Sequence, residues 1–162
     1  MKGDPKVIKQ LNAALSSELT AIVQYMVQAE MHNNWGYYGL GEITKRRAFQ
    51  EMHHAEHLIE RILFLDATPT VDVALTPRIG KDVKSHLETD LADEHEAVEQ
   101  YNAAAAICVD QGDNGSRDLF EKMIKDEEGH VLYLEGQMQI IKDTGIENYL
   151  ATQMDDGTGE KK

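Results

Sequence analysis

Two stretches of the sequence decide the fold: EMHH at residues 51–54 and EEGH at residues 127–130. Each has a glutamate followed three residues later by a histidine, within a long segment whose apolar residues recur at helical spacing. Residues three apart share one face of a helix, so each stretch presents a carboxylate and an imidazole to the same neighbour. One such motif arises often by chance, and the distance between the two is therefore the informative quantity.

A constant offset of 76 residues relates the two motifs, because 127 − 51 and 130 − 54 both give 76. The same offset carries Glu18 onto Glu94 (94 − 18 = 76) and Tyr25 onto Tyr101 (101 − 25 = 76). Glu18 and Glu94 each interrupt an apolar, core-facing stripe. Two helical hairpins are thus expected to present matching groups at matching heights. The six candidate ligands are Glu18, Glu51, His54, Glu94, Glu127 and His130.

Periodicity and capping signals predict an all-α protein with four long helices. We expect them over residues 5–34, 41–65 and 82–110 and, with Ser116 as N-cap, from there to Gly145; the apolar stripe of the first includes Met26. Residues 66–80 hold two of the three prolines and predict a long crossover, with room for one short extended piece. A crossover of this length makes the second and third helices parallel. Residues 146–154 predict a short fifth helix, and 155–162 a polar, disordered tail.

Composition narrows the range of functions. The 162 residues include 29 Asp and Glu against 16 Lys and Arg, a net charge of −13, which disfavours binding to nucleic acid or to anionic membranes. The single Cys108 excludes an internal disulfide and a thiolate zinc site. No apolar run is long enough to cross a membrane, and the N-terminus has no signal region, so we expect a cytoplasmic protein.

Four carboxylates inside a bundle would repel one another and lose their hydration, so they require a neutralising partner. Two divalent ions supply four positive charges against the four negative ones, and two neutral imidazoles add nitrogen ligands without charge. Oxygen and nitrogen ligands without thiolate suit iron or manganese, with zinc as a competitor. The six residues therefore predict a two-metal centre.

The chain resembles bacterioferritin, a haem-containing member of the ferritin-like di-iron superfamily, over residues 1–154. The resemblance rests on the six residues above and on local matches: MKGDPKVI at 1–8, RILFL at 61–65, SRD at 116–118, DEEGH at 126–130 and ENYL at 147–150. It implies one ferritin-like domain over 1–154, a ferritin-like four-helix bundle with the long crossover between helices two and three. It also implies that Glu51 and Glu127 bridge two irons, while Glu18, His54, Glu94 and His130 each favour one.

The resemblance further implies a ferroxidase that oxidises Fe(II) with O2 or H2O2 and stores ferric mineral inside a 24-subunit shell. Met52 matches the position that binds haem b, with one haem shared by each two-fold pair of subunits. Spacing alone would make Met52 an ordinary core or interface methionine. A haem held by two methionines serves electron transfer, here for mineral reduction and iron release, with a reductase such as a small ferredoxin as the expected partner.

Some alternatives stay open at this stage. A non-catalytic haem and iron container would use the same ligands as a fixed cofactor site, whereas a DNA-protecting mini-ferritin fits the acidic charge poorly. Positions where some bacterioferritins have His and Asp facing the cavity are Arg46 and Gln50 here, which weakens the expectation of an inner-surface iron site. Tyr25 and Trp35 have either a redox role or a packing role. Five histidines are assigned no function: His32, His53, His57, His86 and His95.

Overall fold

The computed structural model describes residues 1–71 and 76–154, and within them the regular structure is entirely helical. The helices are α1 (Pro5–Asn34), α2 (Tyr38–Phe64), α3 (Val83–Asp110), α4 (Asn114–Thr144) and the short α5 (Ile146–Ala151). The all-α prediction and the short fifth helix are confirmed. The predicted tail at 155–162 and part of the crossover, residues 72–75, lie outside the described residues.

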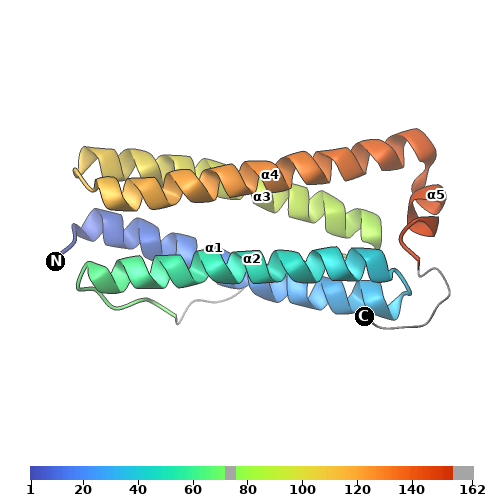
Figure 1. Ribbon diagram of the computed structural model, residues 1–162, viewed down its shortest axis with the longest axis horizontal. Coiled ribbons are helices and arrows are strands. Elements are labelled where there is room, and N and C mark those ends of the chain that lie inside the picture. Colours follow the sequence, from blue (N-terminus) through green and yellow to red (C-terminus); the bar gives the residue numbers. More distant parts are fainter. Residues whose placement is uncertain (72–75, 155–162) are drawn as a thin grey trace.

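The four long helices form two antiparallel hairpins, α1 with α2 and α3 with α4, which lie one on the other (Figure 1). The connection between α2 and α3 returns along the length of the bundle, so these two helices run in the same direction (Figure 1). Short α5 folds across the end of the bundle at which α2 and α3 begin. The predicted four-helix bundle with one long crossover is confirmed.

Helix starts follow from capping side chains, with one correction to the prediction. Asp4 accepts a hydrogen bond from the backbone N–H of Lys6, ahead of proline at the first helical position. Ser116 was expected to cap α4, but Asp113 is the cap: its Oδ1 accepts from the backbone N–H of Ser116 at 3.0 Å. Asp113 is also a good cap and lies three residues before Ser116 in the sequence, so α4 begins at Asn114.

Helix α2 begins at Tyr38, three residues before the predicted start at Gly41. A glycine is needed at position 41 because Asn33 lies against it: a Cβ on Gly41 would lie 2.0 Å from Oδ1 of Asn33. This close approach lets the α1–α2 connection be short. The residue therefore serves helix packing and does not mark a helix boundary.

The apolar core is divided between the two ends of the bundle. One cluster contains Leu11, Leu58 and Phe120, and the other contains Leu87 and Tyr149. Along α2, α3 and α4, the candidate ligands fall between these two clusters, whereas Glu18 on α1 lies between residues of the first cluster. The prediction is wrong for one residue of the apolar stripe of α1. Met26 is 54% exposed, because it lies on the outer side of this helix.

Candidate metal centre

The structure brings the six predicted residues together in the middle third of the bundle. Helix α1 supplies Glu18 and α3 supplies Glu94, while α2 and α4 each supply one Glu and one His from a single face. All six side chains are buried. Their carboxylate and imidazole atoms form two groups of four, and within each group the potential ligand atoms lie within 4.8 Å of one another.

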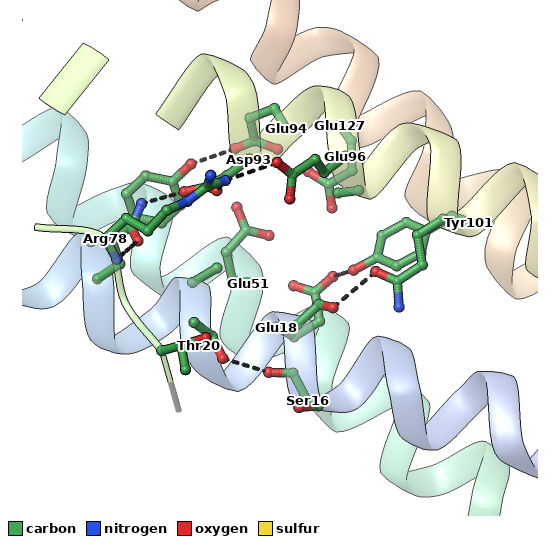
Figure 2. A pocket seen from close by; sticks show the side chains of 17 residues that line it. Ser16, Glu18, Thr20, Glu51, Arg78, Asp93, Glu94, Glu96, Tyr101 and Glu127 are labelled. Atoms are coloured by element: carbon green, nitrogen blue, oxygen red, sulfur yellow. Dashed lines mark hydrogen bonds and ion pairs between the residues drawn. The ribbon is translucent and has the colours of Figure 1, made fainter. Parts of the chain in front are cut away.

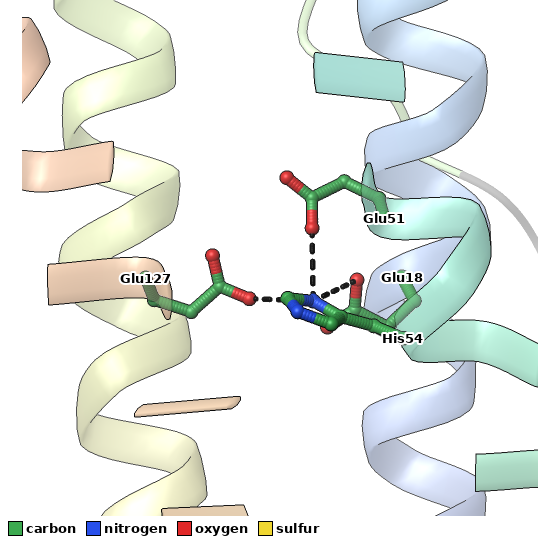
Figure 3. A group of neighbouring side chains, drawn as sticks. All are labelled: Glu18, Glu51, His54 and Glu127. Carbon is green, nitrogen blue, oxygen red and sulfur yellow. Dashed lines mark ion pairs between the residues drawn. The ribbon is translucent and has the colours of Figure 1, made fainter. Parts of the chain in front are cut away.

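The first group surrounds Nδ1 of His54 (Figure 3). This nitrogen lies 3.1 Å from Oε2 of Glu51, 3.1 Å from Oε1 of Glu127 and 3.6 Å from Oε2 of Glu18. Glu127 reaches the group from the opposite hairpin, whereas the other three residues come from the α1–α2 hairpin (Figure 3). The first group therefore joins the two halves of the bundle.

The second group surrounds Nδ1 of His130 in the same way. That nitrogen lies 2.7 Å from Oε2 of Glu127, 3.3 Å from Oε1 of Glu51 and 3.3 Å from Oε1 of Glu94. Glu51 and Glu127 belong to both groups, with a different oxygen of each carboxylate facing each histidine. This is the geometry required of two carboxylates that bridge a pair of ions.

Several atoms at this centre lack the hydrogen bonds that buried polar groups normally make. Within residues 1–71 and 76–154, no hydrogen-bond partner is present for either carboxylate oxygen of Glu51, for Oε2 of Glu127, or for Nδ1 of His54 and His130. Leaving five such atoms unsatisfied is costly in a folded protein. A pair of divalent cations would satisfy all five, so the donor set fits the predicted metal centre.

Burial also perturbs the acidity of the carboxylates. Burial raises the pKa of Glu51 to about 7, and it raises the pKa of Glu18 and Glu127 as well. The pKa of Glu94 lies well above its ordinary value, first through burial and then through repulsion from Glu127 and Glu51. His54 behaves in the opposite way: burial lowers its pKa, but the nearby carboxylates of Glu127, Glu18 and Glu51 outweigh burial and raise it. The metal-free centre thus holds protons that a cation would displace.

Two tyrosines tie the single glutamates to the opposite hairpin. The hydroxyl of Tyr25 on α1 donates to Oε1 of Glu94 on α3, and the hydroxyl of Tyr101 on α3 donates to Oε1 of Glu18 on α1. Burial raises the pKa of both phenols well above 10, so both remain protonated donors. The 76-residue offset had paired these tyrosines, and the contacts show that each orients a carboxylate.

One neighbour of the centre was missed at the sequence level. Nε2 of His54 lies 3.1 Å from Oδ2 of Asp126, which fixes the imidazole with Nδ1 toward the glutamates. The 76-residue offset pairs Asp126 with position 50 (126 − 76 = 50), but that position holds Gln50, so the repeat gave only a partial signal. Gln50 is exposed, and no hydrogen bond from it to His130 is present in the described part of the chain. The two halves of the centre are therefore unequal in their outer contacts.

The remaining candidate residues lie away from this centre. Met52, the predicted haem ligand, is 37% exposed on the outside of the bundle, although Glu51 beside it points inward. His53 and His57 are exposed, as expected of solvated side chains, and Cys108 is buried and free.

No helix among the described residues is long and apolar enough to cross a membrane.

His32 and His86, to which no function was assigned, form a buried pair at the α1–α3 interface, with Nε2 of His32 2.9 Å from Nδ1 of His86. His86 also donates from Nε2 to the backbone carbonyl of Gly80, so the pair attaches the end of the crossover to the bundle. Trp35 stacks on His86, with ring centroids 5.4 Å apart, which gives this tryptophan a packing role.

A four-helix bundle with two inward-facing E-x-x-H motifs and two further glutamates defines the ferritin-like di-metal proteins. In agreement, the ferritin-like domain family matches residues 8–144. The chain is 43% identical over 149 residues to bacterioferritin from Rhodobacter capsulatus and 42% identical over 149 residues to that from Brucella melitensis, covering 92% of each chain. It is 41% identical to bacterioferritin from Mycolicibacterium paratuberculosis over 151 residues, 93% of this chain and 95% of the relative. The chain belongs to the bacterioferritin family.

Proposed function

We propose that this protein is an iron-storage ferroxidase, which oxidises pairs of Fe(II) ions at the six-residue centre and deposits the ferric product as mineral. Membership in the bacterioferritin family supports iron storage as the general role. The observation that carries the catalytic step is the pair of overlapping ligand groups that share Glu51 and Glu127. A single structural ion would need one such group, whereas two shared carboxylates hold two ions close enough to react together.

Each residue has a defined role in this proposal. Glu18 and His54 bind one Fe(II), Glu94 and His130 bind the other, and Glu51 and Glu127 bridge them. Four carboxylates balance the charge of two Fe(II) ions, so loading the centre leaves no net charge buried. Tyr25 and Tyr101 hold the terminal carboxylates in place through hydrogen bonds from across the bundle.

The proposed oxidation balances with either oxidant. Two Fe(II) ions give two electrons, which with two protons reduce one O2 to H2O2, or one H2O2 to two molecules of water. Proximity is the main contribution of the protein, because both electrons leave from one site in one encounter. Oxidised iron then leaves for the mineral, and the emptied centre accepts the next pair of Fe(II) ions.

Iron oxidation by a matched pair of variants tests this proposal. Glu127→Gln removes one charge from the buried centre, and Glu128→Gln makes the same change at the exposed neighbouring position. Under anaerobic conditions, the wild-type protein and Glu128→Gln should bind two Fe(II) per chain and oxidise them rapidly once O2 or H2O2 is added. Glu127→Gln should lower the initial rate about 10- to 100-fold, because the centre loses one of its two shared carboxylates.

Two results would contradict the ferroxidase. Equal initial rates in the two variants would mean that iron is not oxidised at the six-residue centre. Binding of two Fe(II) per chain without oxidation faster than in buffer would instead favour the non-catalytic container. The DNA-protecting alternative requires association with DNA, which the charge of −13 opposes.

We further propose that Met52 binds haem b together with its mate from a second subunit, one haem per two subunits. Its partial exposure on the outer side of α2 supports this, because a ligand shared between two copies must project away from its own bundle. Such a haem would carry electrons from a reductase such as a small ferredoxin to the mineral.

Reconstitution with haem tests this assignment. Met52→Leu should abolish the haem absorption of the reconstituted protein, whereas Met31→Leu on the same hairpin should retain it. Haem absorption in both variants would show that Met52 is not the ligand.

Assembly completes the proposed function. A single ferritin-like domain over residues 1–154 would form two-fold dimers that build a hollow cytoplasmic shell of 24 copies, in keeping with the family. The large negative charge supports this role, since acidic surfaces raise the local concentration of Fe(II). Native mass spectrometry tests the shell directly, and a monomer at working concentration would contradict it.

A further inference from the structure

A cavity of about 480 Å³, lined mostly by residues with polar or charged side chains, connects the centre to the surface between α1 and α3. Its inner wall contains four of the six predicted ligands, Glu18, Glu51, Glu94 and Glu127. Its outer rim contains Arg78 from the crossover and Asp93 and Glu96 from α3 (Figure 2). We call these three residues the rim. A cation that enters here meets the rim before it meets the ligands.

The Arg78 side chain occupies the position that an incoming cation would take at the rim. Its guanidinium forms ion pairs with Asp93 and with Glu96, the latter at 3.1 Å (Figure 2). Arg78 therefore neutralises one of two negative charges that would otherwise attract divalent ions into the cavity. These pairs are partly solvated, with the side chains of Arg78 and Glu96 49% and 70% exposed, so they exchange readily with solvent.

The backbone at Arg78 is held independently of its side chain. Its N–H donates to Oε1 of Gln24 at 2.7 Å, and Nε2 of Gln24 donates in turn to Asp93 at 2.7 Å and to Asp90 at 2.9 Å. Asp90 is buried and also accepts from Gln28 at 2.8 Å. This hydrogen-bond network fixes the crossover over the cavity, so the guanidinium can leave the rim while the main chain stays in place.

We propose that Arg78 is a charge gate on this cavity, which slows the passage of divalent cations to and from the centre. The inference rests on the proposed function, because it assigns the route by which that centre is loaded. A cation must exchange with the guanidinium at Asp93 and Glu96. Because the gate acts on passage in both directions, it changes rates of association and dissociation more than it changes equilibrium affinity.

Rapid-mixing measurements of Co(II) binding to the metal-free wild-type protein and to Arg78→Gln test the gate. Loss of the guanidinium changes the net charge of the rim from −1 to −2, so association should accelerate about three- to tenfold at low ionic strength and depend more steeply on salt. Dissociation into a chelator should accelerate as well. Arg117→Gln, the same change at a partly buried position of α4 that does not line the cavity, is the matched control. Arg78→Lys should fall between wild type and Arg78→Gln.

The outcomes separate this inference from the proposed function. Two Co(II) per chain with rates that do not change in Arg78→Gln would overturn the gate and leave the two-metal centre intact. An equal acceleration in Arg117→Gln would also overturn it, because the effect would then come from total charge. Failure of the wild-type protein to bind two Co(II) per chain would overturn both proposals.

Discussion

Replacing Glu51 by glutamine should stabilise the metal-free protein while weakening its binding of metal. Both carboxylate oxygens of Glu51 are buried without a hydrogen-bond partner among the described residues, and burial raises the pKa of this group to about 7. A carboxyl group with a raised pKa destabilises the fold when it ionises, because the unfolded state loses the proton more easily. Glutamine keeps the shape of the side chain and removes the ionisation.

The magnitude follows from the two pKa values. Between the ordinary value of 4.5 and the folded value of about 7, the stability of the metal-free wild type should fall by about 3 kcal/mol as pH rises, and it should stay low above pH 7. Glu51→Gln should remove most of this loss. At pH 8 its thermal midpoint should therefore lie about 6 to 12 °C above that of the metal-free wild type, with a smaller difference near pH 4.5.

Thermal unfolding of metal-free and Co(II)-loaded protein between pH 4.5 and pH 8 measures both halves of the prediction. Added Co(II) should stabilise the wild type strongly and Glu51→Gln weakly, because a bridging oxygen is lost. Glu60→Gln, the same change at an exposed position of α2, is the control and should match the wild type. A metal-free Glu51→Gln that is less stable than wild type at pH 8 would refute the reasoning, because Glu51 would then contribute to the fold without metal.

Two further predictions concern histidines. Asp126→Asn should weaken binding at the metal position of His54 about 10- to 100-fold, because the imidazole loses its charged acceptor at Nε2; a Co(II) titration should show one weakened step, and two unchanged steps would contradict this role. Burial lowers the pKa of His32 from 6.5 to about 4, so the folded protein should lose up to about 3 kcal/mol of stability as pH falls across that window. His32→Gln, which keeps a donor toward His86, should lose less stability over the same interval in chemical unfolding; an equal loss would assign the effect elsewhere.

The sequence predicted the arrangement of the centre because helical geometry is regular. Once Glu18, Glu51 and their mates at the 76-residue offset lie on apolar stripes, the 3.6-residue period leaves little freedom in where they point. Details that depend on competition between neighbouring residues were less accessible. Ser116 and Asp113 are both good caps, and Ser116 instead accepts a 2.9 Å hydrogen bond from Arg61.

Long-range polar pairs were missed for a different reason. His32 and His86 are 54 residues apart and carry no periodic signal, so nothing in the chain indicates that their rings meet. The rim residue Arg78 was equally inaccessible, because its position depends on the path of the crossover. Asp126 is an intermediate case, since the repeat pointed to position 50 but the two positions hold different residues.

The division of the core into two apolar ends has a consequence for how this bundle can be altered. Leu11, Leu58 and Phe120 at one end, with Leu87 and Tyr149 at the other, supply burial that does not depend on the polar middle. The middle third is therefore a chamber whose lining can be changed without removing the apolar burial at the two ends, although each change alters stability. Other sets of inward-facing side chains at the same six positions would make this chain a host for different metals, or for a small polar molecule, within an unchanged helical frame.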